Sequence, residues 1–300
     1  MYTRFTITNI QTYVYLIKEV VFVTLYSALI YVLYEYFGHH HITISFSISA
    51  VMGTAIAILL GFRTSAAYDR WWEARKIWGS IVNDSRTLIR QAIGFFKMGD
   101  YKDEEVLRMA KSQIAFCYAL MTSLRKLPLS SEVRNYLSDK DYETIQNDTN
   151  IPNALLELME SRLAILYKQQ KIDTYHFAAM DQTLKGLCDH MGKSERIKNT
   201  IFPVHYGFFI RLSIIIFALL LPLEIVEFLG VLTIPITFAT IIFISVIESI
   251  ANYLQDPFEN RAADIGMSTI CRTIEINLLQ MAGVREVPDM LKPDKNGIVM

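Results

Sequence analysis

The sequence predicts an all-α membrane protein that has four transmembrane helices and a cytosolic helical bundle. Hydrophobic residues make up 52% of the 300 residues, 20% are charged, and the mean hydropathy is +0.27. This chain is too apolar for an average soluble protein, yet it keeps enough polar residues for an aqueous part. The apolar residues gather in four long runs and elsewhere recur at steps of three and four residues, which is typical of helices.

Charge and cysteine content exclude several classes of protein. The net charge is -1, the pI is near 6.6, and no block of lysine or arginine occurs, so we expect no nucleic-acid partner. Cys117, Cys188 and Cys271 lie far apart without a CxxC motif, which indicates neither a disulfide framework nor a zinc site. The scattered histidines lack the spacing of a catalytic motif. We therefore expect no enzyme, no cofactor and no metal centre.

The segments that flank the four expected spans differ from one another in their content of lysine and arginine. Two of these loops, residues 38–45 and the turn at Gly230, contain no lysine or arginine, whereas the N-terminus has Arg4 and Lys18 and the long middle segment has many. The positive-inside rule then places both termini and the middle segment in the cytoplasm, as in a multi-pass protein of the inner (plasma) membrane. The expected spans are residues 20–37, 46–62, 208–229 and 232–254.

These elements predict one integrated fold with four parts. Helices of the cytosolic part are expected near residues 104–125, 154–169 and 174–191, and the residues between 127 and 153 form a linker rich in turn residues. A last amphipathic helix is expected from Met267 to Met281. The four parts are a first transmembrane hairpin with a pore-lining helix (1–75), a cytosolic helical region (76–207), a second transmembrane hairpin (208–255), and a C-terminal helix and tail (256–300).

The second span has two faces of different character. Thr54, Ile58 and Phe62 fall at i, i+4 and i+8 on one face. Gly53, Ala57 and Gly61 form a neighbouring face of small residues, which lets helices approach closely. One interpretation is that the face of Thr54, Ile58 and Phe62 contacts lipid or another helix. The alternative is a pore, in which small faces pack several copies together and the larger residues form an apolar neck that gates by dewetting.

Polar residues near the membrane have alternative roles. Glu224 and Glu227 could favour cations at the outer mouth of a pore, or they could face lipid headgroups. Glu248 and Asn252, one turn apart, are either a structural lock between helices or a functional pair. An ion-pair network is expected where the second helix leaves the bilayer, built from Arg63, Asp69, Arg70, Glu73 and Arg75.

Three motifs, in this order among four spans, resemble those of a bacterial member of the bestrophin family. They are GFRTSAAYDRWWEAR from Gly61 to Arg75, ERIKNTIFPVHY from Glu195 to Tyr206, and the tripeptide from Asp256 to Phe258. The resemblance covers residues 4–283. It implies a homopentameric ion channel in which five copies of the second span surround one pore within the lipid bilayer. Bacterial relatives are typically cation-permeable, whereas animal members are calcium-activated anion channels.

The resemblance also implies where the pore is narrow. The family neck falls on Thr54, Ile58 and Phe62, and a cytosolic exit constriction falls on Tyr175 or, with a shifted alignment, on Ile172. We expect conduction of small monovalent ions, namely cations such as Na⁺ or K⁺ as in bacterial relatives, with an anion-selective chloride channel as the alternative. A non-conducting membrane scaffold or a transporter is the second alternative.

The sequence departs from the family at two informative places. Thr54 stands where an aliphatic residue is usual, which makes the outer end of the neck more easily wetted. The tripeptide ending at Phe258 is followed by ENRAADIG and not by the run of carboxylates that forms the calcium clasp of animal members. Calcium takes six to eight oxygen ligands, which Glu259 and Asp264 alone do not supply. We therefore expect a calcium-independent protein.

Overall fold

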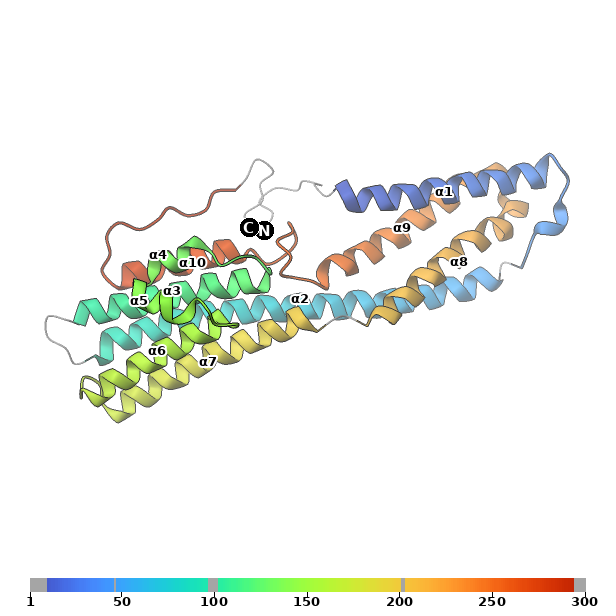
Figure 1. Ribbon diagram of the computed structural model, residues 1–300. Helices are drawn as coiled ribbons and strands as arrows, with labels where there is room; N and C mark the ends of the chain where they lie inside the picture. The colour runs from blue at the N-terminus through green and yellow to red at the C-terminus, as the bar shows by residue number, and fades with distance from the viewer. Residues whose placement is uncertain (1–9, 46, 97–101, 201–202, 294–300) are drawn as a thin grey trace. The chain divides into compact units, whose positions relative to one another are not determined.

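A computed structural model describes residues 10–45, 47–96, 102–200 and 203–293. Every regular element in these ranges is helical, which confirms the predicted all-α class (Figure 1). Residues 17–35, 40–95 and 205–254 are the three described stretches that are long and apolar enough to cross a membrane, judged by length and composition. The third stretch contains two helices, α8 and α9, so the count of four spans stays a prediction.

The chain forms two compact units. We call the described residues within 10–71 and 203–256 the apolar unit, and the described residues within 72–200 and 257–293 the bundle unit. Helix α2 (Ser47–Phe95) contributes its first part to the apolar unit and its remainder to the bundle unit. It is a single helix of 49 residues, as expected from a sequence that has no proline before Pro128.

The apolar unit contains α1 (Ile10–Glu35), the first part of α2, α8 (Val204–Leu229) and α9 (Thr233–Leu254). Helices α1, α8 and α9 pack against one another, and buried side chains of α2 and α8 form much of the interior. The short helix η1 (His40–Ile42) lies between α1 and α2, and η2 (Gly230–Leu232) joins α8 to α9. Gly38 and Gly230 have φ values of +66° and +52°, a conformation that glycine adopts without strain, and each ends a long helix.

The bundle unit is built around α3 (Lys102–Leu124). Its residues 112–122 are buried on every side, which is typical of a central helix. Helices α4 (Ser131–Tyr136), α6 (Ile151–Lys168), α7 (Thr174–Asn199) and α10 (Met267–Met281) each contact α3. The expected helices of this region are therefore present, and the limits of α10 match the prediction.

Two short helices lie in the segment that the sequence predicts as a linker. They are α4 and α5 (Asp139–Ile145). The serines that suggested turns act as N-caps: the Ser130 hydroxyl accepts from the backbone N–H of Glu132, and the Ser138 hydroxyl accepts from that of Asp141, both at 3.2 Å. Serine favours turns and helix starts for the same reason, since its hydroxyl satisfies nearby backbone groups.

Candidate pore-lining site

The three residues of the expected neck lie on the side of α2 that this subunit leaves uncovered. Ile58 is 54% exposed and Phe62 is 67% exposed, and Thr54 is also exposed. Ile56 and Leu60 lie between them in the sequence and are only 2% and 3% exposed, because they join the interior of the apolar unit. The helical period therefore separates an anchored face of α2 from a free face. The role of the free face as a neck stays a prediction.

The small residues of the neighbouring face divide into two kinds. Gly53 packs within the subunit, since a Cβ atom placed there would lie 3.4 Å from the ring of Phe217 on α8. Ala57 and Gly61 are exposed, and a Cβ atom at Gly61 would have no atom within 4 Å. Gly53 thus serves the packing of α2 on α8, while Ala57 and Gly61 leave a shallow surface on the free side of the helix.

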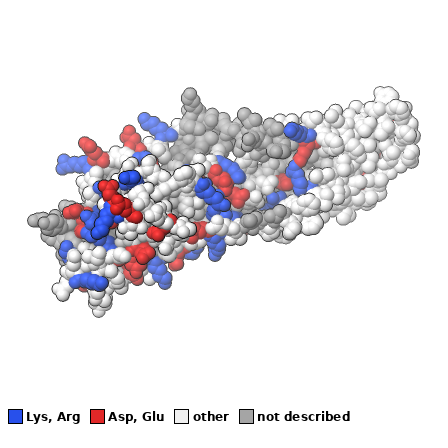
Figure 2. Space-filling view, in the orientation of Figure 1, with Lys and Arg blue, Asp and Glu red and all other residues white. Residues whose placement is uncertain are grey.

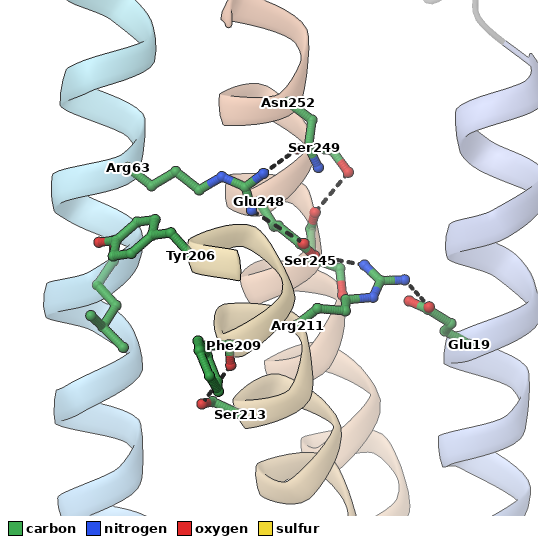
Figure 3. A network of polar contacts seen from close by, with 11 residues as sticks. Glu19, Arg63, Tyr206, Phe209, Arg211, Ser213, Ser245, Glu248, Ser249 and Asn252 are labelled. Atoms are coloured by element: carbon green, nitrogen blue, oxygen red, sulfur yellow. Dashed lines mark hydrogen bonds and ion pairs between the residues drawn. The ribbon is translucent and has the colours of Figure 1, made fainter. Parts of the chain in front are cut away.

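Three helices of the apolar unit, α2, α8 and α9, meet at the carboxylate of Glu248 on α9, and α1 is linked to it through Arg211 (Figure 3). Glu248 is 4% exposed, and its Oε1 lies 3.6 Å from Nη1 of Arg63 on α2. Its Oε2 accepts from Nη1 of Arg211 on α8 at 2.6 Å, and Arg211 also pairs with Glu19 of α1. Nη2 of Arg63 donates to Oδ1 of Asn252 at 2.5 Å. We call these five residues the polar network; it joins two acids to two bases.

The polar network differs from the ion-pair network that the sequence predicts at the membrane interface, and it gives Glu248 and Asn252 a shared partner. Arg63 was expected in an ion-pair network at the membrane interface, but it is 6% exposed and reaches across to α9. Glu73, expected in the same interfacial network, pairs instead with Arg196 of α7 at 2.8 Å. Glu248 and Asn252, singled out by their spacing, both contact the Arg63 guanidinium. Removing one partner of a buried ion pair costs about 3–5 kcal/mol, so the network ties these helices firmly.

Glu224 lies elsewhere than either sequence interpretation placed it. It is 1% exposed, and its two carboxylate oxygens accept from the backbone N–H of Ser49 at 3.0 and 3.1 Å. Ser49 belongs to the first turn of α2, where backbone N–H groups have no partner within the helix. A carboxylate there also complements the positive end of the helix dipole. Glu224 therefore anchors the start of α2, whereas Glu227 is exposed.

The two alternatives for an exit constriction differ in burial. Tyr175, in the first turn of α7, is 87% exposed. Ile172 is 2% exposed and belongs to the hydrophobic core of the bundle unit, so its side chain does not reach the surface. Between them, the Asp173 carboxylate accepts from the backbone N–H of His176 at 2.9 Å and fixes the start of α7. Of the two, Tyr175 is the one whose side chain lies at the surface, and the exit constriction itself stays a prediction.

The segment after the last apolar helix has its carboxylates engaged or buried. Glu259 pairs with Lys198 at 2.5 Å, and this hydrogen bond holds the pKa of Glu259 below its ordinary value. Asp264 is 4% exposed, and burial raises its pKa to about 6 even though the backbone N–H of Arg261 donates to it at 2.9 Å. No group of three or more His, Cys, Asp or Glu side chains is placed to hold a metal ion within the described ranges.

The distribution of charge differs between the two units. On the face drawn in Figure 2, lysines, arginines, aspartates and glutamates are interspersed over the bundle unit. The visible surface of the apolar unit is uncharged apart from one narrow cluster of charged side chains. An uncharged surface over helices of this length is what a lipid bilayer requires, because charged side chains there are costly.

Comparison with known protein families shows which family this chain belongs to. A family model described as "Bacterial/Fungal Bestrophin protein" matches residues 2–280. The chain belongs to this bestrophin family. The structure of a bacterial bestrophin homologue from Klebsiella pneumoniae superposes with a TM-score of 0.84 at 28% identity, covering 90% of this chain and 99% of that chain.

Two relatives of this bestrophin carry functional names. The voltage-dependent anion channel-forming protein YneE of Escherichia coli K12 is 32% identical over 259 residues, which are 85% of this chain and 84% of the relative. The voltage-dependent anion channel-forming protein alr2987 of Nostoc is 30% identical over 264 residues, which are 87% of this chain and 85% of the relative. Both similarities therefore extend over most of each protein.

Replacing Glu224 by glutamine is expected to destabilise this bestrophin by about 1–2 kcal/mol, the difference between a charged and a neutral acceptor plus the lost interaction with the helix dipole. A neutral amide accepts a weaker hydrogen bond than a carboxylate and does not complement the helix dipole. Thermal unfolding in detergent measures the effect. Glu227→Gln is the matched control, since Glu227 lies on the same helix and is exposed. Equal stability of the two variants would contradict the anchoring role of Glu224.

The stability of this bestrophin is expected to depend on the protonation of Asp264. Because its pKa is about 6 in the folded chain and about 3.9 in an unfolded one, the folded state binds more protons between these values. The contribution of Asp264 therefore makes stability fall as pH rises from about 4 to about 6. Asp264→Asn should remove this part of the pH dependence. Melting temperatures recorded between these pH values test it, and an unchanged profile in the variant would contradict it.

Proposed function

We propose that this bestrophin is a homo-oligomeric channel, a pentamer by family resemblance, that conducts small monovalent anions such as chloride. The observation that carries the proposal is the free face of α2, where Thr54, Ile58 and Phe62 project from a helix whose other side is anchored. Copies of this face around one axis would enclose a neck without charges, apolar at Ile58 and Phe62. Family membership and the channel-forming names of the relatives support a channel over an enzyme.

The proposed neck acts by radius and wetting. Apolar side chains of Ile58 and Phe62 offer an ion no replacement for its hydration shell, so the barrier rises steeply as the neck narrows and dries. Thr54 adds a hydroxyl at the outer end of this face. Ala57 and Gly61 give a neighbouring copy room to approach closely. Exposed Tyr175 is the proposed second constriction at the cytosolic exit.

We propose selectivity for anions in place of the cation conduction that the sequence analysis expects. The relatives are named anion channel-forming proteins, which favours the alternative given for this sequence over Na⁺ or K⁺ conduction. The buried position of Glu224 agrees with this choice, since its carboxylate faces the Ser49 backbone and does not contribute a free charge to a cation-attracting mouth. The polar network contains equal numbers of acids and bases.

The proposal includes a placement in the cell. Residues 1–75 supply the pore-lining helix, residues 76–207 and 256–300 form the cytosolic part, and residues 208–255 form the second hairpin. The protein would lie in the inner membrane with both termini in the cytoplasm, because the lysines and arginines concentrate in those segments.

Reversal potentials test the proposed function. Purified protein in a planar bilayer, with a tenfold gradient of KCl, should give a current that reverses near the chloride equilibrium potential, about 59 mV from zero. Reversal near the potassium potential would overturn anion selectivity while keeping the channel. A flux that saturates like a carrier, or no flux from a folded oligomer, would overturn the channel itself.

Shortening the neck side chains should raise the flux. Ile58→Ala and Phe62→Ala widen and wet the constriction, and removing about 1.4 kcal/mol of barrier corresponds to a tenfold increase. Chloride efflux from liposomes measures it. Phe243→Ala is the matched control, since Phe243 of α9 is 68% exposed and Phe62 is 67% exposed. If all three variants resemble the wild type, the neck is not on this face.

A further inference from the structure

Two consecutive residues of α2 have opposite environments. Phe62 is 67% exposed, whereas Arg63 is 6% exposed and contacts Glu248 and Asn252 of α9. Successive residues of an α-helix point about 100° apart, so this contrast fixes how α2 is rotated about its own axis. A long, cationic side chain in an apolar unit would ordinarily extend toward water, yet here it is drawn inward to a carboxylate.

The backbone of α8 is shaped to receive the Arg63 guanidinium. A Cβ atom placed at Gly207 would lie 3.2 Å from Nη2 and 3.6 Å from Cζ of Arg63. Contacts near 3.2 Å are tighter than side chains normally accept, so a side chain at this position would push the guanidinium aside by at least a few tenths of an ångström. Gly207 of α8 and Glu248 of α9 therefore form a seat for Arg63 on two different helices.

The seat is itself held in place. Glu248 accepts a hydrogen bond from Arg211 at 2.6 Å, and Arg211 pairs with Glu19 of α1. The carboxylate that receives Arg63 is thus fixed by the other helices of the apolar unit. Figure 3 shows this chain of contacts running from α2 across α8 and α9 to α1.

The position of Arg63 determines where the proposed neck residues point. At about 100° per residue, Phe62 lies roughly 100° from Arg63 around α2, Ile58 roughly 140° and Thr54 roughly 180°. Holding Arg63 against α8 and α9 therefore turns all three away from the subunit. Without this hold, the two faces of α2 differ little in their preference for burial, since Ile56 and Leu60 on the buried face are about as apolar as Ile58 and Phe62 on the exposed face.

We propose that Arg63, Glu248 and Gly207 are positioning residues for ion conduction: they clamp the rotation of α2 so that Ile58 and Phe62 face the pore axis. The clamp rests on the proposed function, because it assigns these residues a role in shaping that neck. It acts through geometry and not through net charge, since the acids and bases of the polar network balance.

A set of charge-removing variants separates geometry from charge. Arg63→Gln and Glu248→Gln each disrupt the clamp and leave an unbalanced charge of opposite sign. The double variant Arg63→Gln with Glu248→Gln disrupts the clamp but leaves Glu19 and Arg211 as a balanced pair. Each variant is combined with Phe62→Ala, and chloride efflux from liposomes is compared with and without that second change. Arg196→Gln removes an exposed ion pair with Glu73 and is the control.

The clamp predicts how the effect of Phe62→Ala changes among these backgrounds. In the wild-type and Arg196→Gln backgrounds, Phe62→Ala raises efflux about tenfold, and in both single variants and the double variant the increase falls to about twofold or less. A double variant in which Phe62→Ala again raises efflux tenfold would overturn the clamp and assign the network an electrostatic role. Retention of the tenfold effect in all backgrounds would overturn it as well.

Gly207→Ala gives a test that changes no charge. The added methyl group pushes the guanidinium by a few tenths of an ångström against Glu248 and Asn252, which weakens the clamp. The effect of Phe62→Ala should therefore again fall, while size-exclusion chromatography and circular dichroism show the wild-type assembly and helix content. If the double variant does not fold, Gly207→Ala is the variant that tests the clamp. If wild-type protein conducts and Phe62→Ala has its full effect in the Gly207→Ala background, the clamp is wrong and the channel stands. If the wild type does not conduct, the proposed function itself is wrong.

Discussion

The buried pair between Arg63 and Glu248 is the interaction on which the apolar unit depends. An arginine and a glutamate in apolar surroundings are tolerated only when each satisfies the other, and leaving either alone costs several kcal/mol. Here Glu248 forms ion pairs with the guanidinium groups of Arg63 and Arg211, and Arg211 also pairs with Glu19. One carboxylate thereby joins helices that are far apart in the sequence, and any movement of α2 must first break charged contacts that water does not readily replace.

This arrangement explains how a helix with charge beside its proposed neck can present an uncharged free face. Arg63 follows Phe62 directly, yet its guanidinium lies against Gly207 on the opposite side from Thr54. Glu224 is likewise turned inward, where it bonds to the first turn of α2. The two ends of the apolar part of α2 are thus both fixed by charged side chains within the subunit, and between them the free face carries only apolar, small and hydroxyl side chains. Such a surface suits a barrier governed by wetting.

The sequence predicts the helices well and their partners poorly. Period and length identified α2 as one long helix and placed both limits of α10, because these features depend on neighbours within one turn or two. Short α4 and α5 were missed, since serine promotes turns and helix starts alike. The contacts of Arg63 with Asn252 and of Ser49 with Glu224 span 189 and 175 residues. A periodic pattern shows which side of a helix is buried but not what it meets there.

The most direct test of this account is an electron cryomicroscopy structure of the assembled protein in lipid nanodiscs. The account predicts that Ile58 and Phe62 of every copy surround one shared water-filled axis, while Arg63 of each copy contacts Glu248 of the same copy. Density that shows those two apolar side chains against acyl chains, or enclosed within a single subunit with no central opening, would contradict it.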